Sequence, residues 1–149
     1  MPFTLIHGFI AYISVALFTK DRKLRALGFI GGLWPDLDAI SLLFGNEAYL
    51  HYHKLMHPLV FGVLFGVLAA IIAGRFFKMG RMKSFAAFTA GFFLHIFFDL
   101  FFTDWAIRLL WPFSQQLFIW PLFINQFILL HAMATLAFLV VLFLERKER

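Results

Sequence analysis

The sequence predicts an all-α membrane protein: a polytopic bundle of about five transmembrane helices, in one domain over residues 1–149. Hydrophobic residues make up 62% of the chain and charged residues 14%, whereas soluble domains are nearer half apolar and a quarter charged. The apolar residues also form runs long enough to cross a bilayer core, separated by basic or turn-rich segments. Cysteine is absent, which excludes disulfides and thiolate metal ligands.

The apolar runs define five expected helices, at residues 3–19, 24–44, 57–73, 84–103 and 122–144. The first run has neither a basic segment before it nor a small-residue cleavage site after it, so we expect it to be retained. The second helix is expected to break at Gly31–Pro35, because Pro35 lacks a backbone donor and paired glycines weaken the preceding turn. Such a break at membrane depth is tolerated where it lines a polar cavity.

The positive charge gathers on one side of this predicted topology. Five spans place eleven of the thirteen Lys and Arg residues on the side of the C-terminus: Lys20, Arg22, Lys23, Arg25, Arg75, Lys78, Arg81, Lys83, Arg146, Lys147 and Arg149. By the positive-inside rule, the N-terminus lies outside and the C-terminus in the cytoplasm. We therefore interpret the net charge of +5 as loop charge, and expect membrane lipid, not nucleic acid, as the partner. The oligomeric state is left open.

Histidine and aspartate gather on the opposite side. His95 and Asp99 are four residues apart in an otherwise apolar helix, so they share one face, and a carboxylate there is costly unless it is neutralised. Three other segments bring similar groups to the same depth, and the full candidate set is His7, Asp36, Asp38, His53, His57, His95 and Asp99. The topology used only Lys and Arg, so this convergence is an independent observation.

Imidazole and carboxylate without thiolate suit zinc best, with iron, manganese or nickel as alternatives. Seven ligands exceed one tetrahedral site, so two or three ions are expected. Such clusters activate water for attack on phosphorus. One carboxylate, Asp38 or Asp99, is a candidate catalytic base, and Lys54 and Arg108, the basic residues on this side, are candidates for phosphate contact. His131 is interpreted as a packing or hydrogen-bonding residue.

Each element of this set has an ordinary alternative. His95 with Asp99 also suits a buried hydrogen-bonded pair, the aspartates at 36 and 38 suit helix capping, and His53 with His57 suits surface loop histidines. The convergence of four segments favours the metal site over these alternatives taken separately.

Several motifs carry a family resemblance. In chain order they are His7-Gly8, Pro35-Asp36-Leu37-Asp38, His53-x-x-x-His57, Gly91-x-x-x-His95-x-x-x-Asp99 and Trp111-Pro112-Phe113. Over roughly residues 7–112 the chain resembles the YdjM-like family of LexA-regulated, membrane-bound, metal-dependent hydrolases of bacteria and archaea. That family is regarded as a distant relative of the zinc-dependent phospholipase C and single-strand nuclease superfamily.

The resemblance implies a His/Asp metal cluster, phosphoester hydrolysis and location in the cytoplasmic membrane of a prokaryote. The family's histidine pair usually reads His-Arg-x-x-Thr-His-Ser, whereas Lys54, Met56 and Pro58 stand at three of those positions here, so two hydroxyls are absent. The first functional hypothesis is a hydrolase of a phospholipid or lipid-linked phosphate at the outer leaflet. The alternatives are a metal-ion carrier or sensor using the same ligands, and a scaffold in which the polar cluster only fixes helix packing.

Overall fold

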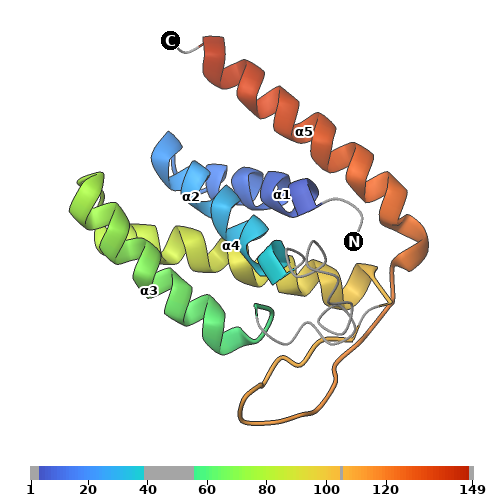
Figure 1. Cartoon of the computed structure of the whole chain (residues 1–149). Coiled ribbons are helices and arrows are strands. Elements are labelled where there is room, and N and C mark those ends of the chain that lie inside the picture. The colour runs from blue at the N-terminus through green and yellow to red at the C-terminus, as the bar shows by residue number, and fades with distance from the viewer. Residues whose placement is uncertain (1–3, 39–55, 105, 148–149) are drawn as a thin grey trace.

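The computed structural model describes residues 4–38, 56–104 and 106–147, and confirms the all-α architecture. Its helices, in chain order, are α1 (Thr4–Ala16), α2 (Arg22–Leu33), α3 (Leu59–Phe76), α4 (Arg81–Phe102), the 3-10 helix η3 (Ile124–Gln126) and α5 (Phe127–Lys147). In the described part of the chain, β pairing is limited to one isolated bridge between Ile107 and Phe118. Figure 1 shows α1 to α4 grouped together and α5 at their edge.

Helix α4 is the centre of the bundle, and α1, α2 and α3 all pack against it. Its buried stripe recurs every four residues, at Phe88, Phe92, Ile96 and Leu100, the spacing that keeps side chains on one helical face. The loop between α4 and η3 adds Ile107 to this core. The ligand-bearing residues of α4 therefore stand on the most enclosed helix.

Glycines allow α2 and α4 to approach at backbone distance. A Cβ atom on Gly31 would lie 2.1 Å from the Phe88 carbonyl oxygen, and one on Gly91 would lie 2.1 Å from the Gly28 carbonyl oxygen. Small residues at contacts are typical of membrane helices, where close packing replaces the hydrophobic effect as the driving force. This contact brings the end of α2 beside the second half of α4, where the candidate ligands lie.

Among the helices of the described residues, α3, α4 and α5 are long and apolar enough to cross a membrane. With 13 and 12 residues, α1 and α2 are shorter than the roughly 17 to 25 residues that a span needs. Within α4, half of the most apolar 18-residue stretch is buried inside the protein, whereas only 11% of the corresponding stretch of α5 is buried. The outer face of α5 is thus suited to lipid.

The expected break after Gly31 is present. Helix α2 ends at Leu33, and the chain continues as a 3-10 stretch over residues 34–38, consistent with the missing donor of Pro35. The remainder of the expected helix at 24–44 lies outside the described residues. The other helices begin or end within a few residues of expectation; α5 starts at Phe127 because η3 precedes it.

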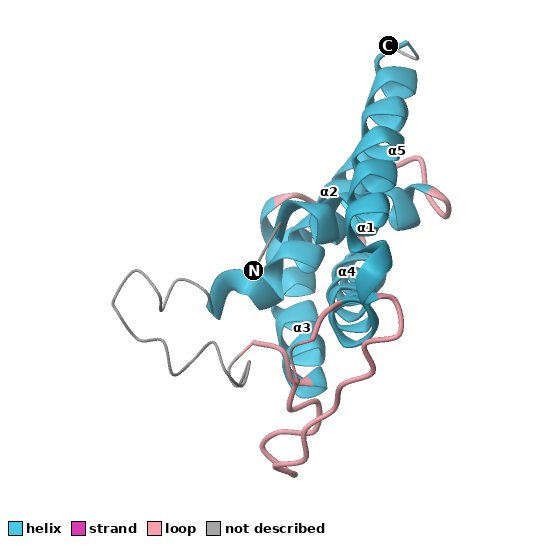
Figure 2. Cartoon of the chain, turned by 90° about the vertical axis from the view of Figure 1, so that its right-hand side faces the viewer, coloured by secondary structure: helices cyan, strands magenta, loops and turns pink. Residues whose placement is uncertain are grey.

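The two ends of the bundle differ in composition. In Figure 1 the start of α2, the end of α3 and the start of α4 lie on the left, with the end of α5 above them; these segments carry the basic residues. The start of α1 and the end of α4 lie on the right, and the connection from α4 to η3 leaves the bundle there and extends below it. Figure 2 shows that connection from the side. We call these the basic end and the histidine end.

Candidate metal centre

Four of the seven predicted ligands meet at the histidine end. One ligand atom from each of Asp36, His57, His95 and Asp99 lies within 4.8 Å of the others. Asp36 comes from the 3-10 stretch after α2, His57 from the turn before α3, and the remaining two from α4. His57 and His95 are completely buried. Two imidazoles and two carboxylates form a donor set that suits a divalent cation.

Local sequence places each donor. His57 precedes Pro58, which caps α3 in an extended conformation. Because the residue before a proline is restricted away from helical geometry, His57 stays outside the helix. The start of α3 is held by the Leu59 backbone N–H, which donates to the Leu109 carbonyl 2.9 Å away. Asp36 follows buried Pro35, and the 3-10 stretch turns its carboxylate toward α4.

His95 is oriented by a backbone carbonyl. Its Nδ1 donates to the Gly32 carbonyl oxygen at 2.7 Å, so Nε2 is directed to the opposite side of the ring. This Nε2 is buried and has no hydrogen-bond partner among the described residues, yet it lies 3.2 Å from Asp99 Oδ2 and 3.6 Å from Asp36 Oδ1. A metal-binding histidine typically donates its other ring N–H to a carbonyl or carboxylate, and His95 does so.

His57 repeats this arrangement with a carboxylate behind it. Its Nδ1 donates to Asp38 Oδ2 at 3.0 Å, and its Nε2 lies 3.4 Å from Asp99 Oδ2. The carboxylates of Asp38 and Asp99 thus lie on the two sides of the His57 ring. The surroundings of His57 therefore favour a cation. Asp38, predicted as a ligand and a catalytic candidate, orients His57 in this geometry.

His7 lies at the edge of the cluster. Its Nε2 is 3.6 Å from Asp99 Oδ1, and its Nδ1 is 2.7 Å from His95 Nδ1. Asp99 thus presents one oxygen to His7 and the other to His57 and His95, as a carboxylate bridging two cations would. The geometry is compatible with more than one ion, although the compact four-ligand group provides for one.

The other predicted residues have different outcomes. His53 and Lys54 lie outside the described residues, so their ligand and phosphate roles stay predictions. Arg108 donates to Gln115 within the connection between α4 and η3, so its guanidinium already has a partner in that loop, and its contact with phosphate also stays a prediction.

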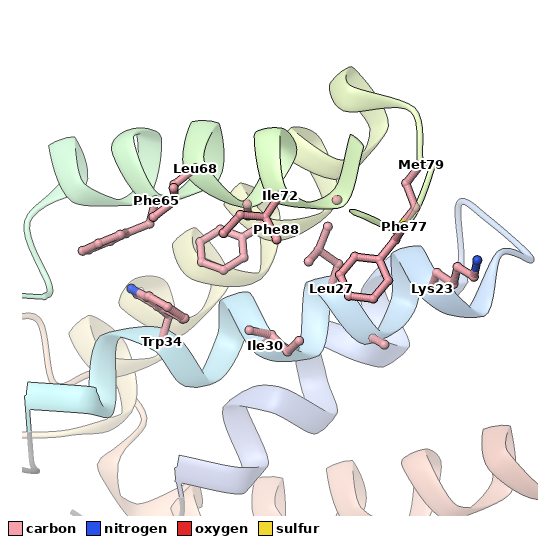
Figure 3. Close-up of a pocket in the computed structure, with 13 residues that line it drawn as sticks. Lys23, Leu27, Ile30, Trp34, Phe65, Leu68, Ile72, Phe77, Met79 and Phe88 are labelled. Carbon is pink, nitrogen blue, oxygen red and sulfur yellow. The ribbon is translucent and has the colours of Figure 1, made fainter. Parts of the chain in front are cut away.

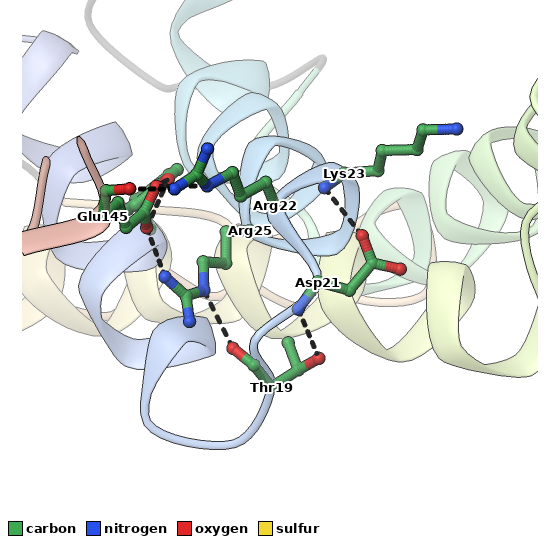
Figure 4. A network of polar contacts seen from close by, with 7 residues as sticks. Thr19, Asp21, Arg22, Lys23, Arg25 and Glu145 are labelled. Carbon is green, nitrogen blue, oxygen red and sulfur yellow. Dashed lines mark hydrogen bonds and ion pairs between the residues drawn. The ribbon is translucent and has the colours of Figure 1, made fainter. Parts of the chain in front are cut away.

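Sequence reasoning missed two features around these residues. The carbonyl of Gly32 carries no side-chain signal, although the Gly28-x-x-x-Gly32 spacing indicates a close helix contact. At the basic end, Glu145 of α5 accepts hydrogen bonds from Tyr12 and Arg25 and pairs with Arg22 (Figure 4). The sequence alone suggested only a charged tail there.

A separate groove lies between α2 and α3. It has a volume of about 380 Å³. Figure 3 shows Leu27 and Ile30 of α2, and Trp34 directly after it, facing Phe65 and other apolar side chains. None of the cluster residues lines it, and Lys23 marks the end nearest the basic end. This groove is an apolar packing surface, distinct from the metal centre.

Comparisons with known proteins agree with a membrane location. No curated protein and no solved structure matched the chain. A family model described as YdjM inner membrane protein matches residues 1–149. With a whole-length match, apolar helices of spanning length and a His/Asp cluster that could hold a metal ion, this chain belongs to the YdjM family of inner membrane proteins.

Proposed function

We propose that this chain is a membrane-embedded, metal-dependent hydrolase that cleaves a phospholipid or a lipid-linked phosphate. The observation that carries the proposal is the orientation of the two buried histidines. Each directs Nε2 toward Asp99 while Nδ1 donates to an anchoring oxygen, Gly32 for His95 and Asp38 for His57. A buried pair serving only helix packing does not require this double anchoring.

Zinc is the proposed cation, with iron, manganese or nickel as alternatives, because all donors are imidazole nitrogen or carboxylate oxygen. Asp36 and Asp99 supply two negative charges, which a divalent cation balances. When bound, such an ion provides Lewis acidity and lowers the pKa of a coordinated water toward neutrality. The hydrolytic step itself is inferred from this chemistry together with the family resemblance.

The chain's own residues have separate proposed roles. His57, His95, Asp36 and Oδ2 of Asp99 would hold the ion, and Asp38 fixes the tautomer of His57. The side chain of Asp99 is 11% exposed, so its edge facing His7 can accept a proton from water. Between Asp38 and Asp99, we propose Asp99 as the base, because its side chain is 11% exposed and that of Asp38 only 4%.

A metal carrier would need polar groups leading from the cluster to the basic end. Along the described α4, the buried residues that lead away from the cluster are mostly apolar, including Phe92, Phe88 and Ala87. This arrangement supports an enclosed, one-sided site and favours hydrolysis over transport.

The proposed orientation places the cluster in the outer half of the membrane, with the N-terminus outside and the C-terminus in the cytoplasm. Because the chain lacks cysteine, single cysteines at positions 54 and 78 can be labelled in intact cells with an impermeant maleimide. Position 54 should react and position 78 should not. The reverse pattern would overturn the orientation.

Metal analysis and hydrolysis assays on the purified protein test the function. Wild type should bind stoichiometric zinc and release phosphate or headgroup from a lipid panel, whereas Asp99→Asn should lose both. Asp104→Asn is the matched control, because Asp104 is exposed and should keep both properties. Stoichiometric metal without hydrolysis, together with ion uptake into liposomes, would instead identify a carrier. Absence of metal from wild type would overturn both proposals.

A further inference from the structure

Helix α5 contacts the bundle differently along its length. Toward the basic end, Phe138 stacks on Phe9 with ring centroids 4.2 Å apart and meets the edge of Tyr12. Further along, Glu145 bonds to Tyr12 and Arg25 (Figure 4). This half of α5 is anchored by aromatic packing and ion pairs.

Toward the histidine end, a groove separates α5 from α1. Its volume is about 590 Å³, within the range of small-molecule sites. The lining is formed by Ile6, Ile128, His131, Ala132, Thr135, Leu136 and Leu139. His131 and Thr135 are one helical turn apart on α5 and are the polar members of an otherwise apolar lining.

The groove adjoins the metal centre. Ile6 of its wall is the neighbour of His7, and His131 is close enough to His7 to interact with it electrostatically. The side chains of His7 and Asp99 are 12% and 11% exposed, whereas those of His57 and His95 are fully buried. The cluster is therefore accessible at its edge near His7, the residue that the groove approaches.

The chemistry of the lining suits an amphiphile. A polar pair at the level of His7 matches one polar headgroup, and the aliphatic wall matches a hydrocarbon chain. The groove is bordered by α5, and only 11% of the apolar membrane-spanning stretch of α5 is buried inside the protein. A hydrocarbon chain of a lipid can therefore enter the groove sideways from the bilayer. None of the cluster residues lines either groove, but the groove between α1 and α5 includes Ile6, the chain neighbour of His7.

We propose that the α1–α5 groove is the lateral access route by which one acyl chain of a lipid phosphoester enters, with His131 contacting the headgroup beside His7. This assignment rests on the proposed function and extends it. It names the substrate class as a lipid carrying a hydrocarbon chain. It also gives His131 a substrate-contacting role.

A bulky residue in the groove tests the route. Ala132→Trp fills it, and the matched control Met133→Trp adds the same side chain at the next position, which is 61% exposed and outside the lining. Both variants should retain the metal content of wild type. Ala132→Trp should lower kcat/KM for phosphatidylglycerol in detergent micelles by at least about tenfold, and leave hydrolysis of the water-soluble bis(p-nitrophenyl) phosphate unchanged. Met133→Trp should match wild type on both substrates.

His131→Ala provides a second test. It should raise KM for phosphatidylglycerol more than it lowers kcat, with metal content unchanged, since it removes a headgroup contact and no ligand of the ion. Equal losses on phosphatidylglycerol and on the soluble ester in Ala132→Trp, or wild-type lipid hydrolysis by that variant, would overturn the route.

Cross-linking separates failure of the route from failure of the proposed function. Phosphatidylglycerol with a photoreactive acyl chain should label wild type and Met133→Trp within residues 128–139, and label Ala132→Trp there much less. This pattern without hydrolysis would support the groove and reject catalysis. Equal labelling of all three proteins would reject the groove even if wild type were active.

Discussion

The two ends of the bundle both bury carboxylates, but they neutralise them differently. At the basic end, the side chain of Glu145 is 11% exposed and pairs with Arg22 and Arg25. At the histidine end, the ion-pair partners of Asp36 and Asp99 in the described part of the chain are all histidines. Arginine is always charged, whereas histidine titrates near neutrality.

This difference indicates that the histidine end, and not the basic end, requires an added cation. Glu145 is neutralised within the chain, and Tyr12 adds a further donor at 2.8 Å, so the basic end is structurally complete. At the histidine end, carboxylate oxygens lie around the Nε2 atoms of His57 and His95, and these rings carry no permanent positive charge. A cation from solution would complete it, which is why one cluster is proposed as a metal centre and the other as a structural tie.

Metal removal should give the largest effect. An ion that binds only the folded state, at about a hundredfold above its Kd, stabilises by about 3 kcal/mol. Chelation should therefore lower the unfolding temperature in detergent by roughly 6 to 12 °C, measured by tryptophan fluorescence, and zinc should restore it. Asp99→Asn should not respond to the chelator. An equal response in that variant would place the stabilising ion elsewhere.

Removal of one arginine side chain at the basic end should have the second-largest effect on stability. Arg25→Met leaves Glu145 short of a partner and should cost about 2 kcal/mol, seen as a lower unfolding temperature with unchanged metal content. Since removing both members of a buried pair is better tolerated than removing one, Arg25→Met combined with Glu145→Leu should recover much of the loss. A double variant less stable than the single one would contradict this account.

Widening the contact between α2 and α4 should act on the metal centre in particular. A Cβ atom at position 91 would lie 2.1 Å from the Gly28 carbonyl oxygen and 2.9 Å from the Gly32 nitrogen. Gly91→Ala should cost about 1 to 2 kcal/mol. It should also weaken zinc binding by about tenfold, because the Gly32 carbonyl that orients His95 moves away. The affinity is measured by competition with a chelating dye.

The control for that variant is Gly80→Ala, where the nearest atom to the added Cβ is Lys83 Cδ at 4.0 Å. It should leave zinc affinity and unfolding temperature unchanged. Equal zinc affinities in the two variants would show that His95 does not depend on the helix contact.

Tyr12→Phe should give the smallest change. It removes a hydroxyl that donates to Glu145, while both arginines remain, and should cost about 0.5 to 1 kcal/mol. Thermal unfolding at several salt concentrations provides the measurement. A loss as large as that of Arg25→Met would mean that the hydroxyl, and not the cations, neutralises Glu145.

Much of the helical framework was predictable from the sequence. Apolar runs ended by basic turns located the helices, and Pro35 marked the end of regular α-helix near Leu33. The end of α1 at Ala16 was not predictable, because hydropathy does not show where hydrogen bonding changes from α to 3-10. The placement of η3 before α5 has the same cause.

The candidate site was predictable in composition but not in geometry. The i, i+4 spacing correctly placed His95 and Asp99 together, 3.2 Å apart, because helical periodicity is a local property. The roles of Asp38 and Gly32 depend on which oxygen reaches which ring nitrogen. That is settled by the packing of α2 against α4, to which side-chain patterns are a weak guide. His131 approaches His7 only through the packing of α5 on α1.

The order of ligands along the chain has a consequence for biosynthesis. The four residues of the compact cluster, and His7 beside it, all lie within the first 99 residues, whereas α5 begins only at Phe127. A ribosome therefore delivers every one of these donors to the membrane before it delivers α5. The proposed ion would then have access to these donors while the side facing His7 is still open, before the last helix docks on the bundle.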